Sequence, residues 1–243
     1  MTKIWAHRGA SALYPENTLL AFQKAVELGV DGIELDVHLT RDGVPVVAHD
    51  ERIDRVANGS GLIAAMTYGE LARLNFGVAF PALPPQPIPT LDQVLALLSP
   101  GATLLNIELK TDQMDYPGLE EKTLKALEHF GMVSRTVLSS FNPATLRRLQ
   151  RLAPQLQTAL LYKRPLRRPW VMAQQLGATA LHPYYRFLFI PGLVRRCRQH
   201  GIALRPWTVN EPRALRRLLS MGVEGIITDR PDRALRLAKF PKA

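Results

Sequence analysis

Apolar and polar residues alternate strictly from Gly32 to Leu39, and this period of two predicts a β-strand. The apolar side chains share one face of the strand, and Glu34, Asp36 and His38 share the other. Side chains two positions apart on a strand are roughly 7 Å apart, so two flexible carboxylates can reach a common cation. A half-exposed strand with its polar face in water gives the same pattern, and the rest of the chain has to decide between the two.

Predicted strands and helices alternate along most of the chain. The strands are Lys3–His7, Gly32–Leu39, Thr103–Leu109, Thr136–Ser139, Gln157–Leu161, Ala178–His182, Ile202–Trp207 and Gly225–Thr228. Each is followed by a helix: one from a cap near Asn17 to Leu28, then Thr90–Leu98, Gly118–Phe130, Pro143–Ala153, Pro169–Leu176, Pro191–His200, Glu211–Met221 and Arg230–Ala238. This order predicts a (β/α)8 TIM barrel. A doubly wound open sheet is the alternative, although the chain has no Gly-x-Gly-x-x-Gly and no Gly-Lys-Ser/Thr sequence to suggest a nucleotide-binding fold.

One region departs from this alternation. After the turn at Asp42-Gly43, the apolar run Val44–Ala48 predicts a hairpin return. Residues 50–89 lack a sustained period and contain Asn58-Gly59 and several prolines, so we expect an irregular insertion before the third barrel strand. A length of 243 residues, 47% of them hydrophobic, is typical of one barrel domain, and we expect a single domain over residues 1–243.

Two absences narrow the class of protein. No run of 18 or more apolar residues occurs, and the first residues contain no apolar signal segment, so we expect a cytoplasmic protein. Cys197 is the only cysteine, which rules out an intrachain disulfide and a cysteine-based metal cluster. A metal ion would therefore need oxygen or imidazole ligands.

The excess positive charge lies in the second half of the chain. Residues 1–132 contain 10 Lys/Arg and 17 Asp/Glu, whereas residues 133–243 contain 21 and 4. Arg147, Arg148 and Arg151 fall away from the leucine stripe of their predicted helix, so they should be solvated. A nucleic-acid surface would gather such residues on one side, with aromatic residues between them. The sequence shows neither feature clearly, so we expect no nucleic-acid partner; it leaves the oligomeric state open.

Unusual polar residues stand where the predicted strands end. In a TIM barrel the C-terminal ends of the strands form the catalytic face. The ends of the strands and of the hairpin return carry His7-Arg8-Gly9, Glu34 and Asp36, His49-Asp50, Glu108-Leu109-Lys110, Trp207-Thr208-Val209-Asn210 and Thr228-Asp229. Because Glu108 shares its strand face with Asn106 and Lys110, three carboxylates are expected to point into one mouth.

Three converging carboxylates repel one another unless a cation neutralises them. Oxygen-only ligation makes Mg2+ or Ca2+ the expected cation rather than zinc. Arg8 and Lys110 add donors of the kind that hold an anionic phosphoryl group. Together with two histidines, these residues indicate phosphoryl chemistry.

The same residues, taken in order, resemble the glycerophosphodiester phosphodiesterase family. The resemblance rests on the segments His7-Arg8-Gly9, Pro15-Glu16-Asn17-Thr18, Glu34-x-Asp36, His49-Asp50, Glu108-Leu109-Lys110, Trp207-Thr208-Val209-Asn210 and Thr228-Asp229. Arg55, Asn58-Gly59 and Pro89-Thr90-Leu91 are similar to the family's small insertion before the third strand. Each short motif is weak by itself, but the ordered set covers nearly the whole chain and is highly specific.

The resemblance implies a TIM-barrel hydrolase that uses a divalent metal to cleave glycerophosphodiesters into sn-glycerol 3-phosphate and an alcohol. It assigns roles to eight residues: the metal ligands Glu34, Asp36 and Glu108, the general acid/base pair His7 and His49, the phosphate contacts Arg8 and Lys110, and Trp207 as a wall of the glycerol site. The sequence leaves open which histidine is the acid. It also leaves open whether the nucleophile is water or the glycerol 2-hydroxyl of the substrate.

Several polar residues near the expected site receive supporting roles. Asn17 and Thr18 are expected to cap a helix rather than act in catalysis. His38 is expected to line the mouth outside the catalytic set. Asp50 and Asp229 are expected to make hydrogen bonds behind the site rather than to bind the metal.

Two loops follow predicted strands and should therefore lie on the catalytic face. Residues 163–169 are rich in Lys and Arg, whereas residues 183–190 are mostly apolar and aromatic. A cationic loop beside an apolar one suggests attraction of anionic substrates, including those with an acyl chain or at a membrane surface. Packing of the apolar loop on the barrel rim, or a dimer contact, is the competing interpretation.

The sequence is compatible with two other functions. One is a related barrel phosphodiesterase with another leaving group, such as a lysophospholipase D or an inositol-lipid lyase. The other is a non-enzymatic barrel that binds phosphorylated ligands. The complete set of acid/base and ligand residues favours an enzyme.

Overall fold

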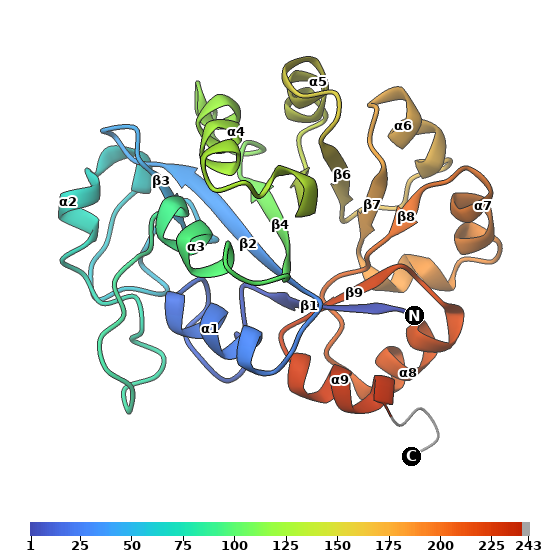
Figure 1. Cartoon of the computed structure of the whole chain (residues 1–243), viewed down its shortest axis with the longest axis horizontal. Coiled ribbons are helices and arrows are strands. Elements are labelled where there is room, and N and C mark those ends of the chain that lie inside the picture. The colour runs from blue at the N-terminus through green and yellow to red at the C-terminus, as the bar shows by residue number, and fades with distance from the viewer. Residues whose placement is uncertain (240–243) are drawn as a thin grey trace.

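Eight parallel strands form the centre of the molecule (Figure 1). The computed structural model describes residues 1–239. The strands are β1 (Lys3–His7), β2 (Gly32–Leu39), β4 (Leu104–Leu109), β5 (Thr136–Ser140), β6 (Gln157–Tyr162), β7 (Ala180–Pro183), β8 (Ala203–Leu204) and β9 (Gly225–Thr228). Their order in the sheet is β8-β7-β6-β5-β4-β2-β1-β9, so strands that follow one another in the chain are neighbours, except that β8 and β9 form the two edges.

The sheet curves into a nearly closed barrel. The first and last strands of the chain, β1 and β9, pair directly. Beyond the end of β8, the amide of Ile227 donates to Pro206 O at 2.9 Å, and the amide of Val209 donates to Ile227 O at 3.0 Å. These bonds link the two edges of the sheet. The predicted TIM barrel is confirmed, and the doubly wound alternative is wrong.

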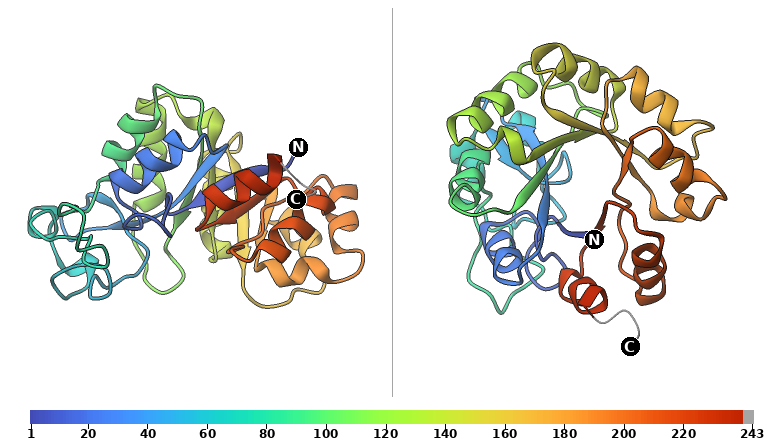
Figure 2. Two further views of the ribbon diagram at one scale, coloured as in Figure 1. Left: turned by 90° about the horizontal axis from the view of Figure 1, so that it is seen from below. Right: turned by 45° about the vertical axis from the view of Figure 1, so that its right-hand side comes forward.

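Helices surround the strands, as the views in Figures 1 and 2 show. They are α1 (Leu19–Glu27), α3 (Leu91–Leu98), α4 (Leu119–His129), α5 (Pro143–Leu152), α6 (Pro169–Gln175), α7 (Leu193–Gln199), α8 (Pro212–Met221) and α9 (Pro231–Lys239). Thr18 caps α1, and Thr90 caps α3 in a capping box with Gln93. None of the helices within residues 1–239 is long and apolar enough to cross a membrane.

The strand predicted at Ile202–Trp207 is shorter than expected. Its regular pairing with β7 covers Ala203 and Leu204, although the amides of Arg205 and Trp207 still donate to Leu181 O and Pro183 O at 3.0 Å each. Pro206 lies between them and faces β9; it has no amide hydrogen to donate to that strand, and its carbonyl accepts the closing bond from Ile227. The prediction therefore located the strand and overestimated its length.

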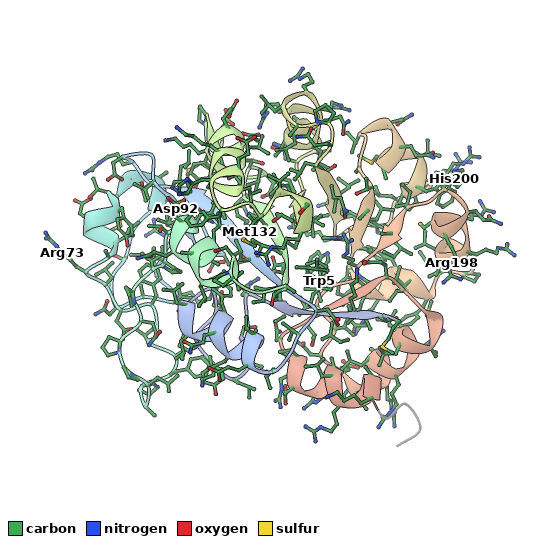
Figure 3. The ribbon with its side chains drawn as sticks, viewed as in Figure 1. Trp5, Arg73, Asp92, Met132, Arg198 and His200 are labelled. Carbon is green, nitrogen blue, oxygen red and sulfur yellow. The ribbon has the colours of Figure 1, made fainter. Side chains whose placement is uncertain are left out.

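Trp5 fills the interior of the barrel (Figure 3). Its ring is 1% exposed, and the Arg205 guanidinium carbon lies 5.3 Å from the ring centroid. A β-carbon at Gly32 would lie 2.4 Å from the indole, and one at Gly225 would lie 2.6 Å from it. The strands on both sides of β1 therefore need glycine to admit this side chain.

The insertion lies beyond α1 and α3, at the left of Figure 1. It follows β3 (Pro45–Val47), which pairs antiparallel with β2 as the predicted hairpin return. The insertion is irregular as predicted, apart from α2 (Tyr68–Leu71) and one turn of 3-10 helix at Ile63–Ala65. It is held by an apolar cluster separate from that of the barrel, which includes Ile53, Ala57, Ile63, Leu71, Phe76 and Ile88.

The Trp5 contact predicts that Gly32→Ala lowers the free energy of unfolding by about 1–3 kcal/mol, the usual range for an overpacked core. Gly69→Ala is the matched control, because a β-carbon there has nothing within 4 Å. Urea unfolding followed by circular dichroism measures both. Equal stability of the two variants would show that the barrel interior adapts to the extra methyl group.

Candidate active site

The centre of the candidate site is built by β2 and β4. The register of these parallel strands sets Asp36 beside Glu108 and Glu34 beside Asn106. Side chains at these positions point to the same side of the sheet, and all three carboxylates are buried. Their nearest ligand oxygens lie within 4.8 Å of one another. The polar face of β2 therefore points into the barrel mouth, and the interpretation of a half-exposed strand is wrong.

The positive charge around the three carboxylates is too small to neutralise all of them. Burial and the neighbouring Asp36 charge raise the pKa of Glu34 well above its usual range. Burial raises the pKa of Glu108 to about 7, although Lys110 opposes this. Burial also acts against the charged form of Asp36, but His49, Lys110 and Arg8 outweigh it and hold that pKa below its ordinary value. A compact set of oxygen donors with this charge deficit fits a hard divalent cation.

Arg8 is held across the cluster by a bent backbone. Its φ of 56° is unusual for a residue with a side chain, and its amide donates to Glu34 Oε2 at 3.0 Å. The guanidinium lies 3.5 Å from Asp36 Oδ2 and donates to Glu16 Oε1 at 2.9 Å. Gly9 follows with φ of 80°, and a β-carbon there would lie 2.7 Å from the backbone of Ala21, so the chain can turn here only with glycine.

Lys110 lies on the other side of the cluster. Its ammonium nitrogen is 2.9 Å from Glu108 Oε1 and 3.8 Å from Asp36 Oδ1. The side chain is buried, and these carboxylates raise its pKa above the ordinary value against the effect of burial. Lys110 therefore stays protonated next to the site.

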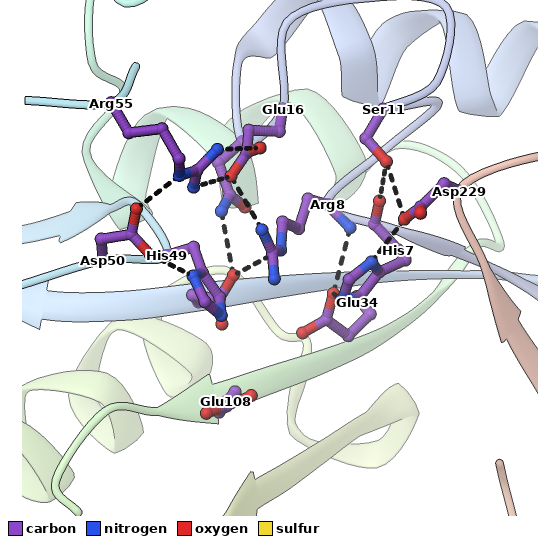
Figure 4. A network of polar contacts seen from close by, with 12 residues as sticks. His7, Arg8, Ser11, Glu16, Glu34, His49, Asp50, Arg55, Glu108 and Asp229 are labelled. Atoms are coloured by element: carbon purple, nitrogen blue, oxygen red, sulfur yellow. Dashed lines mark hydrogen bonds and ion pairs between the residues drawn. The ribbon is translucent and has the colours of Figure 1, made fainter. Parts of the chain in front are cut away.

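Each of the two predicted catalytic histidines has a carboxylate behind it. His7 Nδ1 lies 2.6 Å from Asp229 Oδ1, and His49 Nδ1 lies 2.6 Å from Asp50 Oδ1 (Figure 4). Burial opposes the charged form of Asp229, but the hydrogen bond from His7 lowers the pKa of this acid to about 2. A carboxylate at Nδ1 fixes the tautomer and leaves Nε2 available for proton exchange. Asp50 and Asp229 thus lie where the sequence predicted them.

One cavity of about 330 Å³ brings these groups together. Seven of the eight predicted site residues line it, namely His7, Arg8, Glu34, His49, Glu108, Lys110 and Trp207, and Asp36 lies behind them. A larger cavity of about 580 Å³ lies at the start of β1. Its lining includes no histidine and no carboxylate besides Glu224, so it offers no comparable chemistry.

An aromatic wall closes part of the cavity. The Trp207 indole nitrogen donates to His182 O at 2.7 Å, which fixes the ring. Phe141 packs edge-on against Trp207 at 5.6 Å between centroids, and the Lys163 ammonium lies 5.6 Å from the Phe141 centroid. The site therefore offers an apolar surface beside its charged groups.

Two supporting residues differ from their predicted roles. Thr18 caps α1, but Asn17 does not; with φ of 56° it donates from Nδ2 to Asp36 Oδ2 at 2.9 Å. His38 does not line the cavity. It is buried with Nδ1 2.9 Å from the Tyr116 hydroxyl and Nε2 3.2 Å from His49 O, so it braces the backbone beside His49. Burial lowers its pKa to about 4.

Several further residues at the site received no role from the sequence. Asn106 and Phe141 line the cavity, and Glu16 and Arg55 join the charged network behind it. The Pro15-Glu16-Asn17-Thr18 motif was the available signal for Glu16. Arg55 was distinguished from the neighbouring Arg52 only by its similarity to the family's small insertion, which assigned it no role.

Residues 7–233 match the model of the glycerophosphoryl diester phosphodiesterase family. The chain belongs to this family. A glycerophosphodiester phosphodiesterase of Caldanaerobacter subterraneus subsp. tengcongensis is 44% identical over 239 residues, which cover 98% of each chain. One of Bacillus altitudinis is 38% identical over 245 residues, with complete coverage of both chains.

Solved structures of the family share the fold. A glycerophosphodiester phosphodiesterase of Agrobacterium tumefaciens superposes with a TM-score of 0.87 at 31% identity, covering 97% of this chain and 100% of that one. An Oleispira antarctica phosphodiesterase, solved in complex with the product sn-glycerol-3-phosphate, gives 0.87 at 27% identity with coverage of 98% and 97%. The chain is thus an enzyme, a phosphoric diester hydrolase with glycerophosphodiester phosphodiesterase activity.

The raised pKa of Glu108 predicts how stability depends on pH. Between the ordinary value of 4.5 and about 7 the folded protein keeps a proton that the unfolded chain has released. The free energy of unfolding in EDTA should therefore fall as pH rises through this window, and less steeply in Glu108→Gln. Urea unfolding of both proteins across this range measures the difference. The same slope in both would contradict the assignment.

Proposed function

We propose that this family member needs a divalent cation, Mg2+ or Ca2+, to hydrolyse glycerophosphodiesters to sn-glycerol 3-phosphate and an alcohol. The observation that carries the proposal is the buried cluster of Glu34, Asp36 and Glu108, whose charge deficit suits such a cation. When bound, the cation would withdraw charge from the phosphoryl oxygens. The sn-glycerol-3-phosphate in the Oleispira antarctica structure supports the product.

Arg8 and Lys110 would contact the phosphate. Both line the cavity next to the carboxylates and keep their positive charge. A phosphodiester anion repels nucleophiles, and two fixed cations reduce that repulsion where negative charge develops. The aromatic wall at Trp207 would hold the carbon skeleton of the glycerol moiety.

His7 and His49 would exchange protons with the substrate. One would remove the proton of the nucleophile, and the other would protonate the leaving alcohol. Both rings line the same cavity, and each has Nδ1 committed to a carboxylate. This arrangement supports the pair as acid and base.

We further propose that residues 1–243 act as one domain. Arg55 of the insertion binds Glu16 of the β1–α1 loop, and Met66 O of the insertion accepts from the amide of Arg41, just after β2. The insertion is thereby attached to the barrel at two places. Residues 240–243 lie outside the part of the chain that the structure describes.

An assay of purified protein with glycerophosphocholine and added Mg2+ or Ca2+ tests this function. EDTA and Glu34→Gln should each abolish most turnover. His7→Ala and His49→Ala should each lower kcat by ~10²- to 10⁴-fold, the usual contribution of a positioned acid or base. Circular dichroism checks that the variants fold. Activity indifferent to both EDTA and Glu34→Gln would exclude the metal assignment.

A lipid substrate is the second candidate, because aromatic rings lead away from the cavity. Trp207 contacts Tyr184 at 6.4 Å between centroids, Tyr184 contacts Phe187 at 5.7 Å, and Phe187 stacks on Tyr162 at 5.9 Å. The row reaches a third cavity of about 250 Å³, whose lining includes Leu166, Trp170, Ile190, Arg167 and Arg196. An acyl chain attached to the glycerol would find apolar contacts along these rings, beside the cationic loop 163–169.

The competing interpretation of rim packing has support as well. Tyr185 and Leu188 are buried in the barrel core, whereas Phe187 is partly exposed and Ile190 is 47% exposed. Only part of the apolar loop is therefore available for a lipid.

Turnover of lysophosphatidylcholine and glycerophosphocholine distinguishes these interpretations. An acyl-binding path predicts a lower KM for the lysophospholipid, and Phe187→Ala should remove this advantage without changing glycerophosphocholine hydrolysis. Clear preference for glycerophosphocholine, with no binding to liposomes, would exclude a lipid substrate.

A further inference from the structure

The insertion reaches the active site through one guanidinium group. All of residues 51–89 are described by the structure, and none of them lines the 330 Å³ cavity. Arg55 nevertheless contacts two acids that border the catalytic groups. Its position between them indicates what the insertion contributes to the site.

Arg55 uses all three of its nitrogens. Nε donates to Asp50 Oδ2 at 2.7 Å, and the two terminal nitrogens donate to both oxygens of Glu16 at 2.8 Å each (Figure 4). A planar guanidinium suits such two-pronged binding of a carboxylate. Glu16 therefore fixes the plane of the guanidinium, and this plane aims Nε at Asp50.

The acid at the other end of this contact holds a catalytic histidine. One carboxylate oxygen of Asp50 accepts from Arg55 Nε, and the other lies 2.6 Å from His49 Nδ1. Without Arg55, nothing else in the described hydrogen-bond network of Asp50 would fix its second oxygen. The carboxylate could then rotate, and the His49 ring would lose its fixed orientation.

The backbone that carries Arg55 is anchored independently of these ion pairs. Ile53 is 1% exposed and Ala57 is 7% exposed in the apolar cluster of the insertion. The amides of Val56 and Ala57 both donate to Ile53 O. The Arg55 side chain itself is half exposed, and exposed ion pairs contribute little to folding stability. A stabilising role alone therefore accounts poorly for three hydrogen bonds at this position.

We propose that Arg55 is a positioning residue that orients His49 through Asp50, with Glu16 as its anchor. This rests on the proposed function, in which His49 exchanges a proton with the substrate. The insertion then holds one guanidinium group, that of Arg55, behind a catalytic imidazole. The chemistry of the cavity itself stays with the barrel strands.

The test compares Arg55→Ala with Arg52→Ala. Arg52 is a matched control, because it belongs to the same insertion, is similarly exposed, and pairs at 2.9 Å with Asp54, away from the site. Arg55→Ala should lower kcat on glycerophosphocholine by roughly 10- to 100-fold, the range for partners that orient a working imidazole. KM and Tm should stay close to those of Arg52→Ala, which should have wild-type kcat.

Two further variants separate positioning from a structural role. Arg55→Lys should recover only part of the loss, because one ammonium group cannot reproduce the fork that spans Glu16 and Asp50. In a His49→Ala background, Arg55→Ala should cause no additional loss, since residues that act through one group are not additive.

Three results would overturn the positioning role: wild-type kcat in Arg55→Ala, a loss confined to KM, or an undiminished loss in the His49→Ala background. Full activity of His49→Ala would overturn the acid/base assignment under the proposed function, and the role of Arg55 with it. An active Arg55→Ala beside an inactive His49→Ala overturns only the role of Arg55.

Discussion

The repulsion among three buried carboxylates is the constraint on which the rest of the site depends. Glu34, Asp36 and Glu108 are brought together by the register of β2 and β4, with oxygens within 4.8 Å. Apolar packing of the opposite strand faces holds them in place, so the charges cannot separate without disrupting the barrel core. The neighbouring polar groups each offset part of the negative charge of this cluster. The cationic side chains of Arg8 and Lys110 offset part of it, because they lie beside Asp36 and Glu108.

The backbone next to the cluster is bent so that further hydrogen-bond donors reach the carboxylates. Arg8 and Asn17 both have φ of 56°, a conformation that costs about 1–3 kcal/mol for such residues. The bend lets the Arg8 amide reach Glu34 and the Asn17 amide group reach Asp36. The loop between β1 and α1 therefore gives up backbone stability to supply donors to the acids. The same loop carries Glu16, which connects the cluster to the insertion.

The sequence predicts the fold and the centre of the site because both follow from local periods. Alternation along β2 and β4, combined with the rule for strand ends in barrels, was enough to group Glu34, Asp36 and Glu108. Asn17 was misjudged as a cap, since its αL backbone and its contact with Asp36 depend on how the β1–α1 loop folds over β2. Arg55 and Glu16 are 39 residues apart, and the irregular segment between them has no period that could predict their contact.

In the geometry of the site, acidic residues from the first half of the chain and basic residues from the second half take different positions. The acidic first half supplies the carboxylate cluster, and such a cluster on its own would repel an anionic phosphodiester. The basic second half places Lys163 in the cavity lining, and Arg164, Arg167 and Arg168 are exposed on the same loop. Cations at the mouth raise the local concentration of an anionic substrate. The acids can therefore bind a cation at the centre of the site while the rim attracts a ligand of the opposite sign.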